Sequence, residues 1–291
     1  MQNYKSLAAF ASDLGGAYQL FYFVKKNPIL KKFKKFFFFK GDSESLIKKN
    51  EKGKISSDLN YDLIICSTSG NDYEKNIIDI ANKKKKEIWV ILDNWTNYKE
   101  RLSYKGKTLL TSKIIVTDIY ACELAKKIYK NQFVEISPNY FLEYLKKLKL
   151  KKKKLKKKKV TFFTSPESYF YKKKGNLKSR KKWEKKEKKN LLREISYIKK
   201  SEYFKDNFDH SFLLRLHPQL NFLRNDKNFI YKDFIESEKK NLETSISTTD
   251  ISIGKDSYAL FLTECLKIPT FSIVKSLYKR KLNLPYSINE L

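Results

Sequence analysis

The segment 250–273, DISIGKDSYALFLTECLKIPTFSI, constrains the fold of this chain more than any other stretch. Its apolar residues predict a strand at 251–253, a break at Gly254, a helix at 258–266 and a second strand at 270–274. A short strand–helix–strand passage that is apolar nearly all round is typical of a parallel sheet covered by helices. The segment therefore predicts an α/β protein.

Strands and helices alternate through the rest of the chain. In the first half we expect strands at 6–11, 33–39, 61–66, 87–92, 113–117 and 133–136, and helices at 17–26, 71–83 and 120–129. In the second half we expect strands at 160–164, 211–216 and 229–231, and helices at 180–200 and 236–245. With 291 residues the chain is long enough for two cores. The pattern predicts two Rossmann-like parallel-sheet domains that face each other across a cleft, at 1–145 and 160–291, joined by a lysine-rich linker at 146–159.

The charge of the chain is unusually positive. The formal net charge is +31, and only six of the 63 basic residues are arginine. Lysine, asparagine, isoleucine, phenylalanine and tyrosine are all abundant, as an AT-rich coding sequence would produce. A protein that recognises a nucleic-acid sequence would use arginine for bidentate contacts with bases and phosphates, so specific nucleic-acid binding is not expected. The lysines suit anionic ligands or peripheral contact with an anionic membrane surface.

The remaining composition excludes several classes of protein. Three cysteines, Cys66, Cys122 and Cys265, lie far apart in apolar surroundings, which fits reduced thiols in the cytoplasm. The only histidines are His210 and His217, so a structural zinc site is not expected, and no metal or other cofactor is predicted. No segment has the pattern of a signal peptide or the length of a membrane-spanning helix. We expect a cytoplasmic protein.

The turn after the strand at 251–253 is the first candidate binding site. Ligands of parallel sheets sit at the carboxyl ends of strands, where helix N-termini present free N–H groups to anions. This places Gly254, Lys255, Asp256 and Ser257 at the mouth of a ligand site. Glu264 lies seven residues after Ser257 and shares its helix face, where a ligand's ribose hydroxyls could pair with it. The alternative is that Ser257 only caps the helix and Glu264 bonds a neighbouring lysine.

A second candidate site follows the strand at 211–216. Arg215 and His217 alternate along the strand and therefore point to the same side, and Pro218 fixes the turn after them. An arginine and a histidine at a strand end suit a phosphate or diphosphate, and an imidazole can also carry a proton near neutral pH. The alternative is a histidine that is hydrogen-bonded to a backbone carbonyl in a turn.

The first half offers two more polar loops at strand ends. Asp13, Gly15 and Gly16 lie in the turn after the strand at 6–11, where Asp13 is either an acidic site residue or a helix cap. A second loop follows the strand at 87–92 and contains Asp93, Asn94, Trp95, Asn97 and Tyr98, with Arg101 shortly after. Its aromatic rings could stack on a sugar face and its amides could bond sugar hydroxyls; alternatively the rings pack onto their own sheet. Asp118 and Tyr120, at the next strand end, are expected beside it.

Taken together, these motifs resemble the two-domain GT-B-fold glycosyltransferases. The order Arg215-Leu216-His217-Pro218, then 250–264 with its serine and glutamate, then 267–273, is similar to the subset with a His-Pro motif. That subset includes bacterial capsule sialyl- and polysialyltransferases and the glycerophosphotransferases of teichoic acid synthesis. The turn at 12–16 is similar to the acidic-x-Gly acceptor loop of the same group.

The resemblance implies transfer of a sugar, or a polyol phosphate, from a nucleotide-activated donor to a glycan or lipid-linked acceptor, without a metal. His217 would bind or protonate the leaving phosphate, Ser257 and its backbone would hold phosphate or carboxylate, and Glu264 would contact ribose or sugar hydroxyls. Asp13 would be the general base on the acceptor hydroxyl. Two alternatives remain open: a sugar-nucleotide 2-epimerase, and a non-catalytic lysine-rich binder of anionic polymer or nucleic acid.

Overall fold

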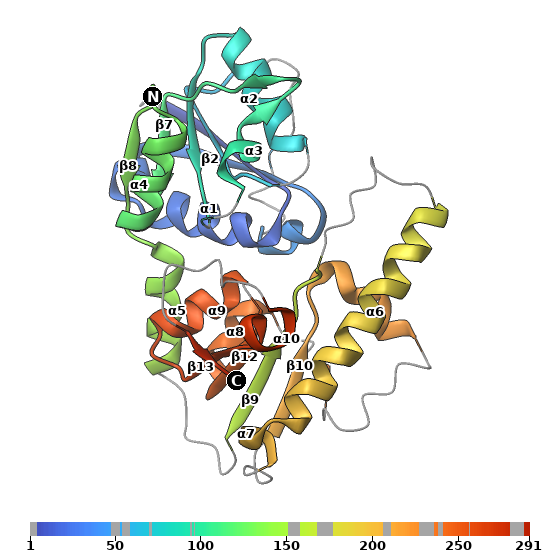
Figure 1. Ribbon diagram of the computed structural model, residues 1–291. Helices are drawn as coiled ribbons and strands as arrows, with labels where there is room; N and C mark the ends of the chain where they lie inside the picture. Colours follow the sequence, from blue (N-terminus) through green and yellow to red (C-terminus); the bar gives the residue numbers. More distant parts are fainter. Residues whose placement is uncertain are drawn as a thin grey trace. The chain divides into compact units, whose positions relative to one another are not determined.

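The computed structural model describes residues 5–47, 53, 59–69, 72–93, 95, 97–150, 158–167, 177–205, 211–226, 236–237, 241–255, 257–279 and 288–291. The chain divides into two compact units, Met1–Glu143 and Tyr144–Leu291. Each unit contains its own parallel sheet with helices packed on it (Figure 1). The predicted α/β class with two Rossmann-like parallel sheets is therefore confirmed, whereas the cleft between the domains stays a prediction.

The first unit is built on a sheet with the strand order β2-β1-β3-β4-β7-β8, in which every pairing is parallel. Its strands are β1 (Lys5–Ala11), β2 (Phe33–Phe39), β3 (Leu63–Cys66), β4 (Glu87–Ile91), β7 (Lys113–Val116) and β8 (Val134–Ile136). Its helical segments are α1 (Leu14–Lys26), η1 (Pro28–Lys32), η2 (Gly41–Leu46), α2 (Tyr73–Lys83), α3 (Tyr98–Arg101) and α4 (Ile119–Ile128). A small antiparallel hairpin joins β5 (Ser103–Tyr104) to β6 (Lys107–Thr108).

The strands of the first unit are apolar on both faces because helices cover the sheet on both sides. All four residues of β3 are buried, as are the last five of β1. One cluster of the core joins Leu7, Leu63 and Ile91 on the strands to Leu20 and Phe23 on α1. Burial of these side chains holds the strand ends, and the loops that follow them, in fixed positions.

The second unit has the strand order β11-β10-β9-β12-β13-β14, again with every pairing parallel. Its strands are β9 (Lys159–Phe163), β10 (Ser211–Arg215), β11 (Glu236–Ser237), β12 (Ile251–Gly254), β13 (Thr270–Ser272) and β14 (Asn289–Glu290). Its helical segments are α5 (Tyr140–Leu150), which begins in the first unit, then α6 (Leu177–Lys200), α7 (Glu202–Lys205), η5 (Pro218–Asn225), α8 (Leu242–Thr248), α9 (Tyr258–Cys265) and α10 (Val274–Tyr278).

Helix α6 lies along one side of the second sheet, and α8 and α9 lie on the other (Figure 1). Leu191 and Ile198, on the inner face of α6, are buried in one cluster with Phe162 and Leu214 of the strands. The spacing of these inner residues is that of an amphipathic helix, whose outer face stays in solvent.

The predicted helix at 236–245 is wrong at its start, because residues 236–237 form the short strand β11 and α8 begins at Leu242. The start of α8 is set by Asn241, whose side chain accepts a hydrogen bond from the Thr244 backbone N–H at 2.8 Å. The predicted strand at 229–231 lies outside the described residues. Of the predicted linker, residues 146–150 belong to helix α5 and 151–157 lie outside the described residues.

Candidate functional site

In the second sheet the order in which the chain adds its strands reverses between β9 and β12. Strands β10 and β11 follow β9 outward on one side, and β13 and β14 follow β12 on the other. At such a switch point the loops at the carboxyl ends of the two central strands diverge, and this opening is where ligands of parallel sheets bind. The candidate site of the second unit is therefore formed by the loops after β9, β10 and β12, which contain His217, Lys255 and Ser257. Arg215 and Gly254 are the last residues of β10 and β12 at the same edge.

His217 is held at the end of β10 by hydrogen bonds at two of its atoms. Its backbone N–H donates to the Thr164 hydroxyl at 2.8 Å, which ties it to the loop after β9. Its Nδ1 accepts from the Gln219 backbone N–H at 3.2 Å and so caps η5. The imidazole therefore bonds to the backbone of its own turn, through an N–H group rather than through the carbonyl that the alternative expected.

The protonation state of His217 follows from its surroundings. Burial, and then the positive charges of Lys255 and Arg215, lower the pKa of His217 to about 4. The imidazole is therefore neutral at pH 7. Because Nδ1 accepts a hydrogen bond, the single ring proton of the neutral imidazole lies on Nε2.

Arg215 is partly fixed by its neighbours. Its Nη1 donates to the Ser245 hydroxyl at 2.7 Å, and its backbone carbonyl accepts from the N–H and the hydroxyl of Thr164. Arg215 is half-buried at the same sheet edge as His217. The pair places a positive charge and a neutral imidazole at the carboxyl end of β10.

Lys255, which the sequence placed at the mouth of a ligand site, points instead into the interior of the unit. Its side chain is buried, and its ammonium lies 2.8 Å from Glu194 of α6 and 3.5 Å from Glu167 after β9. Tyr278 donates a hydrogen bond to the same Glu194 oxygen. Burial raises the pKa of Glu194, and the Lys255 ammonium opposes that rise. Lys255 is therefore not open at the ligand mouth; it joins the β12 loop to α6 and adds positive potential at His217.

The sequence reading missed Glu194, Glu167 and Tyr278. A signal for Glu194 was present, since it lies three residues after Leu191 and four before Ile198 on the inner face of α6. An acidic residue at a core position of a helix indicates a buried cation partner, but the sequence does not say which one.

The remaining predicted residues of the second unit have mixed outcomes. Gly254 lies where β12 meets α9: an added Cβ would lie 2.8 Å from the Phe163 carbonyl and 2.4 Å from a Leu260 methyl. Ser257 caps α9 by accepting from the Leu260 N–H at 3.4 Å, as the capping alternative expected. Glu264 is half-buried at the far end of α9, and no described side chain pairs with it. Asp256 lies outside the described residues.

The first sheet has its own switch point, between β1 and β3. Asp13 follows β1 and caps α1, accepting from the N–H groups of Gly15 and Gly16 at 3.1 and 3.4 Å. This cap is why α1 begins at Leu14 rather than at the predicted residue 17. An added Cβ on Gly15 would lie 3.3 Å from carboxylate oxygens of both Asp13 and Asp93, so the glycine lets the two acids approach.

Asp93 and Arg101 form a buried ion pair at the same edge of the first sheet. Arg101 Nη1 lies 2.5 Å from Asp93 and donates to the Thr68 hydroxyl at 2.8 Å, which links the loops after β3 and β4. Burial and the negative charge of Asp93 raise the pKa of Asp13 to about 6, against the opposing effects of its hydrogen bonds and Arg101. Asp13 is therefore a carboxyl group that can take up or release a proton near neutral pH.

A buried carboxylate that the sequence reading did not identify supports the same loops. Glu74 of α2 accepts from the backbone N–H and hydroxyl of Ser12 at 2.7 and 2.9 Å, and from the Ser69 hydroxyl at 2.7 Å. The Ser67 hydroxyl donates at 3.3 Å. Burial raises the pKa of Glu74, and these hydrogen bonds limit the rise. Glu74 thus fixes the loops after β1 and β3, and with them the position of Asp13.

The aromatic residues of the 93–98 loop are packed inside the unit. Trp95 is 6% exposed and donates to Asp118, while Tyr98 is 2% exposed. Their burial fits the packing alternative rather than stacking on a sugar. Asn97 has a left-handed backbone (φ 55°) at the start of α3. Asn94 lies outside the described residues, and Tyr120 is largely exposed.

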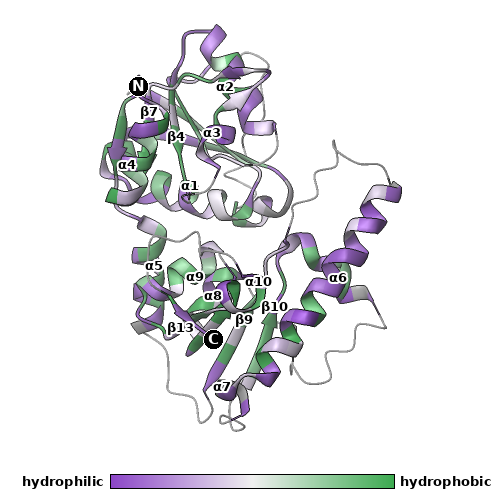
Figure 2. Cartoon of the chain, viewed as in Figure 1, coloured by the Kyte–Doolittle hydropathy of each residue, from purple (hydrophilic) through white to green (hydrophobic). Residues whose placement is uncertain are grey.

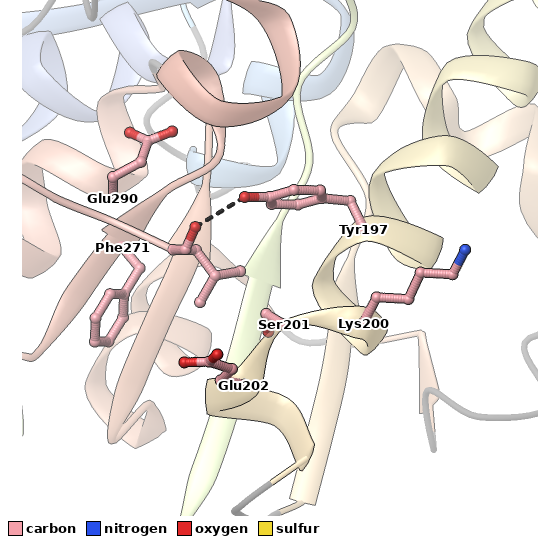
Figure 3. A pocket seen from close by; sticks show the side chains of 7 residues that line it. Tyr197, Lys200, Ser201, Glu202, Phe271 and Glu290 are labelled. Atoms are coloured by element: carbon pink, nitrogen blue, oxygen red, sulfur yellow. Dashed lines mark hydrogen bonds between the residues drawn. The ribbon is translucent and has the colours of Figure 1, made fainter.

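A surface pocket of about 460 Å³ lies elsewhere on the second unit, between the end of α6 and the strands β13 and β14 (Figure 3). In Figure 3 the Tyr197 hydroxyl reaches the Leu291 carbonyl, at 2.9 Å. None of the predicted site residues lines this pocket. Within the described ranges no group of three or more His, Cys, Asp or Glu could hold a metal ion, and no helix there is long and apolar enough to cross a membrane.

No protein-family profile and no curated protein sequence matches the chain. Solved structures do share its fold. The UDP-GlcNAc 2-epimerase of Methanocaldococcus jannaschii in complex with UDP-GlcNAc and UDP aligns with a TM-score of 0.60 and 12% identity, over 98% of this chain and 89% of the other. The S. aureus MnaA–UDP co-structure gives 0.59 and 9%, over 92% and 79%. The wall teichoic acid polymerase TagF gives 0.52 and 15%, over 97% and 72%. The chain thus has a GT-B-like fold of two Rossmann-like units.

Proposed function

We propose that this chain binds a nucleotide-activated sugar at the carboxyl edge of the second sheet and that 2-epimerisation of that sugar is the reaction it catalyses. The observation that carries the proposal is the strand order β11-β10-β9-β12-β13-β14, which places the loops after β9, β10 and β12 around one switch point. Two structural neighbours are described with bound UDP, one of them also with UDP-GlcNAc.

His217 and Arg215 are the proposed contacts of the nucleotide's phosphates. His217 is a neutral imidazole with its ring proton on Nε2, and Arg215 supplies positive charge at the same strand end. With its pKa near 4, the unliganded histidine is not an imidazolium at pH 7 and is therefore not a general acid. Its role is therefore binding of the phosphate oxygen rather than protonation, until the negative charge of a ligand raises its pKa.

The loop after β12 supplies the rest of the phosphate contact. Ser257 caps α9, and the N–H groups at the start of that helix favour an anion. Lys255 acts from behind this loop, since its buried ammonium is paired with Glu194. Glu264 remains a predicted contact of ribose or sugar hydroxyls.

In the first unit Asp13 is the proposed proton-transfer residue. Inversion at C2 breaks the C2–H bond, and its electron pair is accommodated if the nucleotide leaves C1 in the same step. The nucleotide adds back to C1 as a proton returns to the opposite face of C2. Asp13, a carboxyl group with a pKa near 6, is the group that takes up the C2 proton. Arg101 and Asp93 set the charge around Asp13, and Glu74 holds its loop.

Transfer of a sugar or polyol phosphate to an acceptor is the second candidate. The His-Pro motif and the TagF alignment support it, with Asp13 then acting as general base on the acceptor hydroxyl. The structural comparisons support the epimerase better, because the epimerase alignments have the higher TM-scores. A glycan or lipid-linked acceptor belongs to this second candidate only.

Binding is tested by calorimetric titration of the full chain with CMP, CDP, UDP and GDP and with UDP-GlcNAc. We expect one nucleotide to bind, and His217→Ala and Arg215→Ala each to weaken it at least about tenfold. Arg224→Ala is the matched control, because Arg224 is exposed on η5. Equal affinities in all four proteins would show that the proposed site is wrong.

The reaction is tested by incubating the chain with the bound nucleotide sugar in D₂O, with and without acceptor sugars. Epimerisation gives the C2 epimer with deuterium at C2 and needs no acceptor. Transfer gives free nucleotide only when an acceptor is present. Asp13→Asn should abolish either reaction while nucleotide binding is retained.

A further inference from the structure

The outer face of helix α6 is cationic from one end to the other. Its exposed lysines recur at helical spacing and fall on one side, opposite the buried residues Leu191 and Ile198. They are Lys178, Lys181, Lys182, Lys185, Lys186, Lys189 and Lys200, and we refer to these seven residues as the α6 basic face. At 1.5 Å per residue this face is about 33 Å long. Figure 2 shows α6 as mainly hydrophilic along its length.

The acidic residues of α6 are kept away from this face. Glu187 and Glu194 are buried, and Glu184 is paired with Arg180 at 2.8 Å. Among the residues that the structure describes, none of the seven lysines forms an ion pair. Exposed positions of α4 show a different pattern, with Glu123 beside Lys126 and Lys127. A general excess of lysine codons explains many lysines, but it does not explain the segregation of all acids to one side of a 24-residue helix.

We propose that the α6 basic face docks the second unit onto an anionic membrane surface. A straight row of unpaired ammonium groups is complementary to a flat layer of anionic headgroups. The row also contains Leu192, which is 48% exposed and could enter the headgroup region between the lysines. This inference does not depend on the proposed reaction.

The chemistry of the face favours lipid over nucleic acid. Lysine is a compact point charge that lacks the fork with which arginine binds phosphates and bases in pairs. Single-stranded nucleic acids also bind by stacking on exposed aromatic rings. The one tryptophan of α6, Trp183, packs against Phe222 and the core cluster instead.

The test is co-sedimentation of the full chain with vesicles of phosphatidylcholine alone or mixed with phosphatidylglycerol. We expect binding only to the mixed vesicles, in roughly 0.1 M salt, and release at about 0.5 M because the lysines are exposed and screened. Each lysine near an anionic surface contributes about fivefold to the partition coefficient. The triple change Lys181→Gln, Lys185→Gln, Lys189→Gln should therefore weaken binding about 100-fold.

The matched control removes the same charge elsewhere. Lys126→Gln, Lys127→Gln, Lys130→Gln changes three exposed lysines, two in the last turn of α4 and one just after it, and should leave vesicle binding within about threefold of wild type. Far-UV circular dichroism confirms that both triples are folded. Equal losses in the two triples would show that total charge, not the α6 basic face, is responsible. Binding to a single-stranded oligonucleotide without binding to anionic vesicles would also overturn the proposal.

Discussion

The ammonium of Lys255 lies 2.8 Å from a carboxylate oxygen of Glu194, and each of the two side chains is 2% exposed. The pair connects the loop after β12 to the inner face of α6. A second carboxylate, Glu167, lies 3.5 Å from the same ammonium. The contact therefore links two of the loops at the candidate site to the helix that covers this sheet.

Removal of the ammonium should be costly. We expect Lys255→Met to lower the free energy of unfolding by about 3–5 kcal/mol, because Glu194 would remain buried without its cation. Urea denaturation measures this change. The double variant Lys255→Met, Glu194→Leu should recover much of the loss, since it leaves no uncompensated charge on α6.

The control for this pair is an exposed one. Lys83 lies 2.9 Å from Asp79 on α2 and is 71% exposed. Lys83→Met should leave the urea midpoint almost unchanged, because solvent screens the pair. A similar cost for both lysine variants would contradict the structural role given to Lys255.

The second prediction concerns the titration of His217. Its pKa of about 4 lies below that of an unfolded histidine, so the unfolded chain takes up a proton first as the pH falls. Relative to His217→Asn, the wild type should lose stability between about pH 6.5 and pH 4, by at most about 3 kcal/mol, and the difference should be constant above pH 7. Thermal melting of both proteins across this range measures it.

Proton NMR offers an independent check on the same residue. The chain has two histidines, and the ring signals that disappear in His217→Asn identify His217. Those signals should titrate near pH 4 in the wild type and at higher pH in Lys255→Met, because the lysine charge helps to lower the pKa. A midpoint near 6.5 in the wild type would refute the assigned environment.

The third prediction concerns Asp13. Burial raises its pKa to about 6, so ionisation of this carboxyl disfavours the folded state at neutral and alkaline pH. Asp13→Asn keeps a capping side chain and should raise the melting temperature at pH 8, with a smaller gain at lower pH that vanishes near pH 4. The gain corresponds to at most about 3 kcal/mol.

The activity of the wild type should depend on pH in the opposite sense to its stability, because catalysis needs the ionised carboxylate of Asp13. If Asp13 is the proton-transfer base, kcat/KM should fall as the pH drops below about 6, as the carboxyl group becomes protonated. An Asp13→Asn variant that keeps wild-type turnover would exclude this role. A stability gain without loss of turnover would leave Asp13 as a helix cap only.

The fourth prediction concerns Gly254 at the end of β12. An alanine Cβ there would lie 2.8 Å from the Phe163 carbonyl, which cannot move without disturbing β9. Gly254→Ala should therefore destabilise the chain by about 1–3 kcal/mol, measured by urea denaturation. Gly106→Asn is the control: Gly106 has open space around it and a left-handed φ that asparagine tolerates. An unchanged midpoint for Gly254→Ala would contradict the close contact of β9 and β12.

Local sequence patterns were sufficient to predict most of the elements. Apolar runs located β1, β2, β3, β4, β7, β9, β10 and β12 to within about two residues, because strands buried on both faces must be apolar throughout. The position of His217 at a strand end was also predictable, since Pro218 follows the apolar run directly. The helix predicted at 236–245 failed at its start, because two residues of that stretch pair with β10 in the tertiary structure.

The sequence by itself thus determined the buried central strands of both sheets, the loops that follow their carboxyl ends, and the two parallel-sheet units that result. Only the tertiary structure decided that Lys255 is buried against Glu194, which lies 61 residues away in the sequence. It also decided that Arg101 binds both Asp93 and Thr68. The hydrogen bonds from serine residues to Glu74, beside Asp13, were likewise decided there. The physical reason is that the spacing of apolar residues along the chain indicates only which positions are buried. The partner of a buried charge depends on strand order and packing, which no local pattern contains.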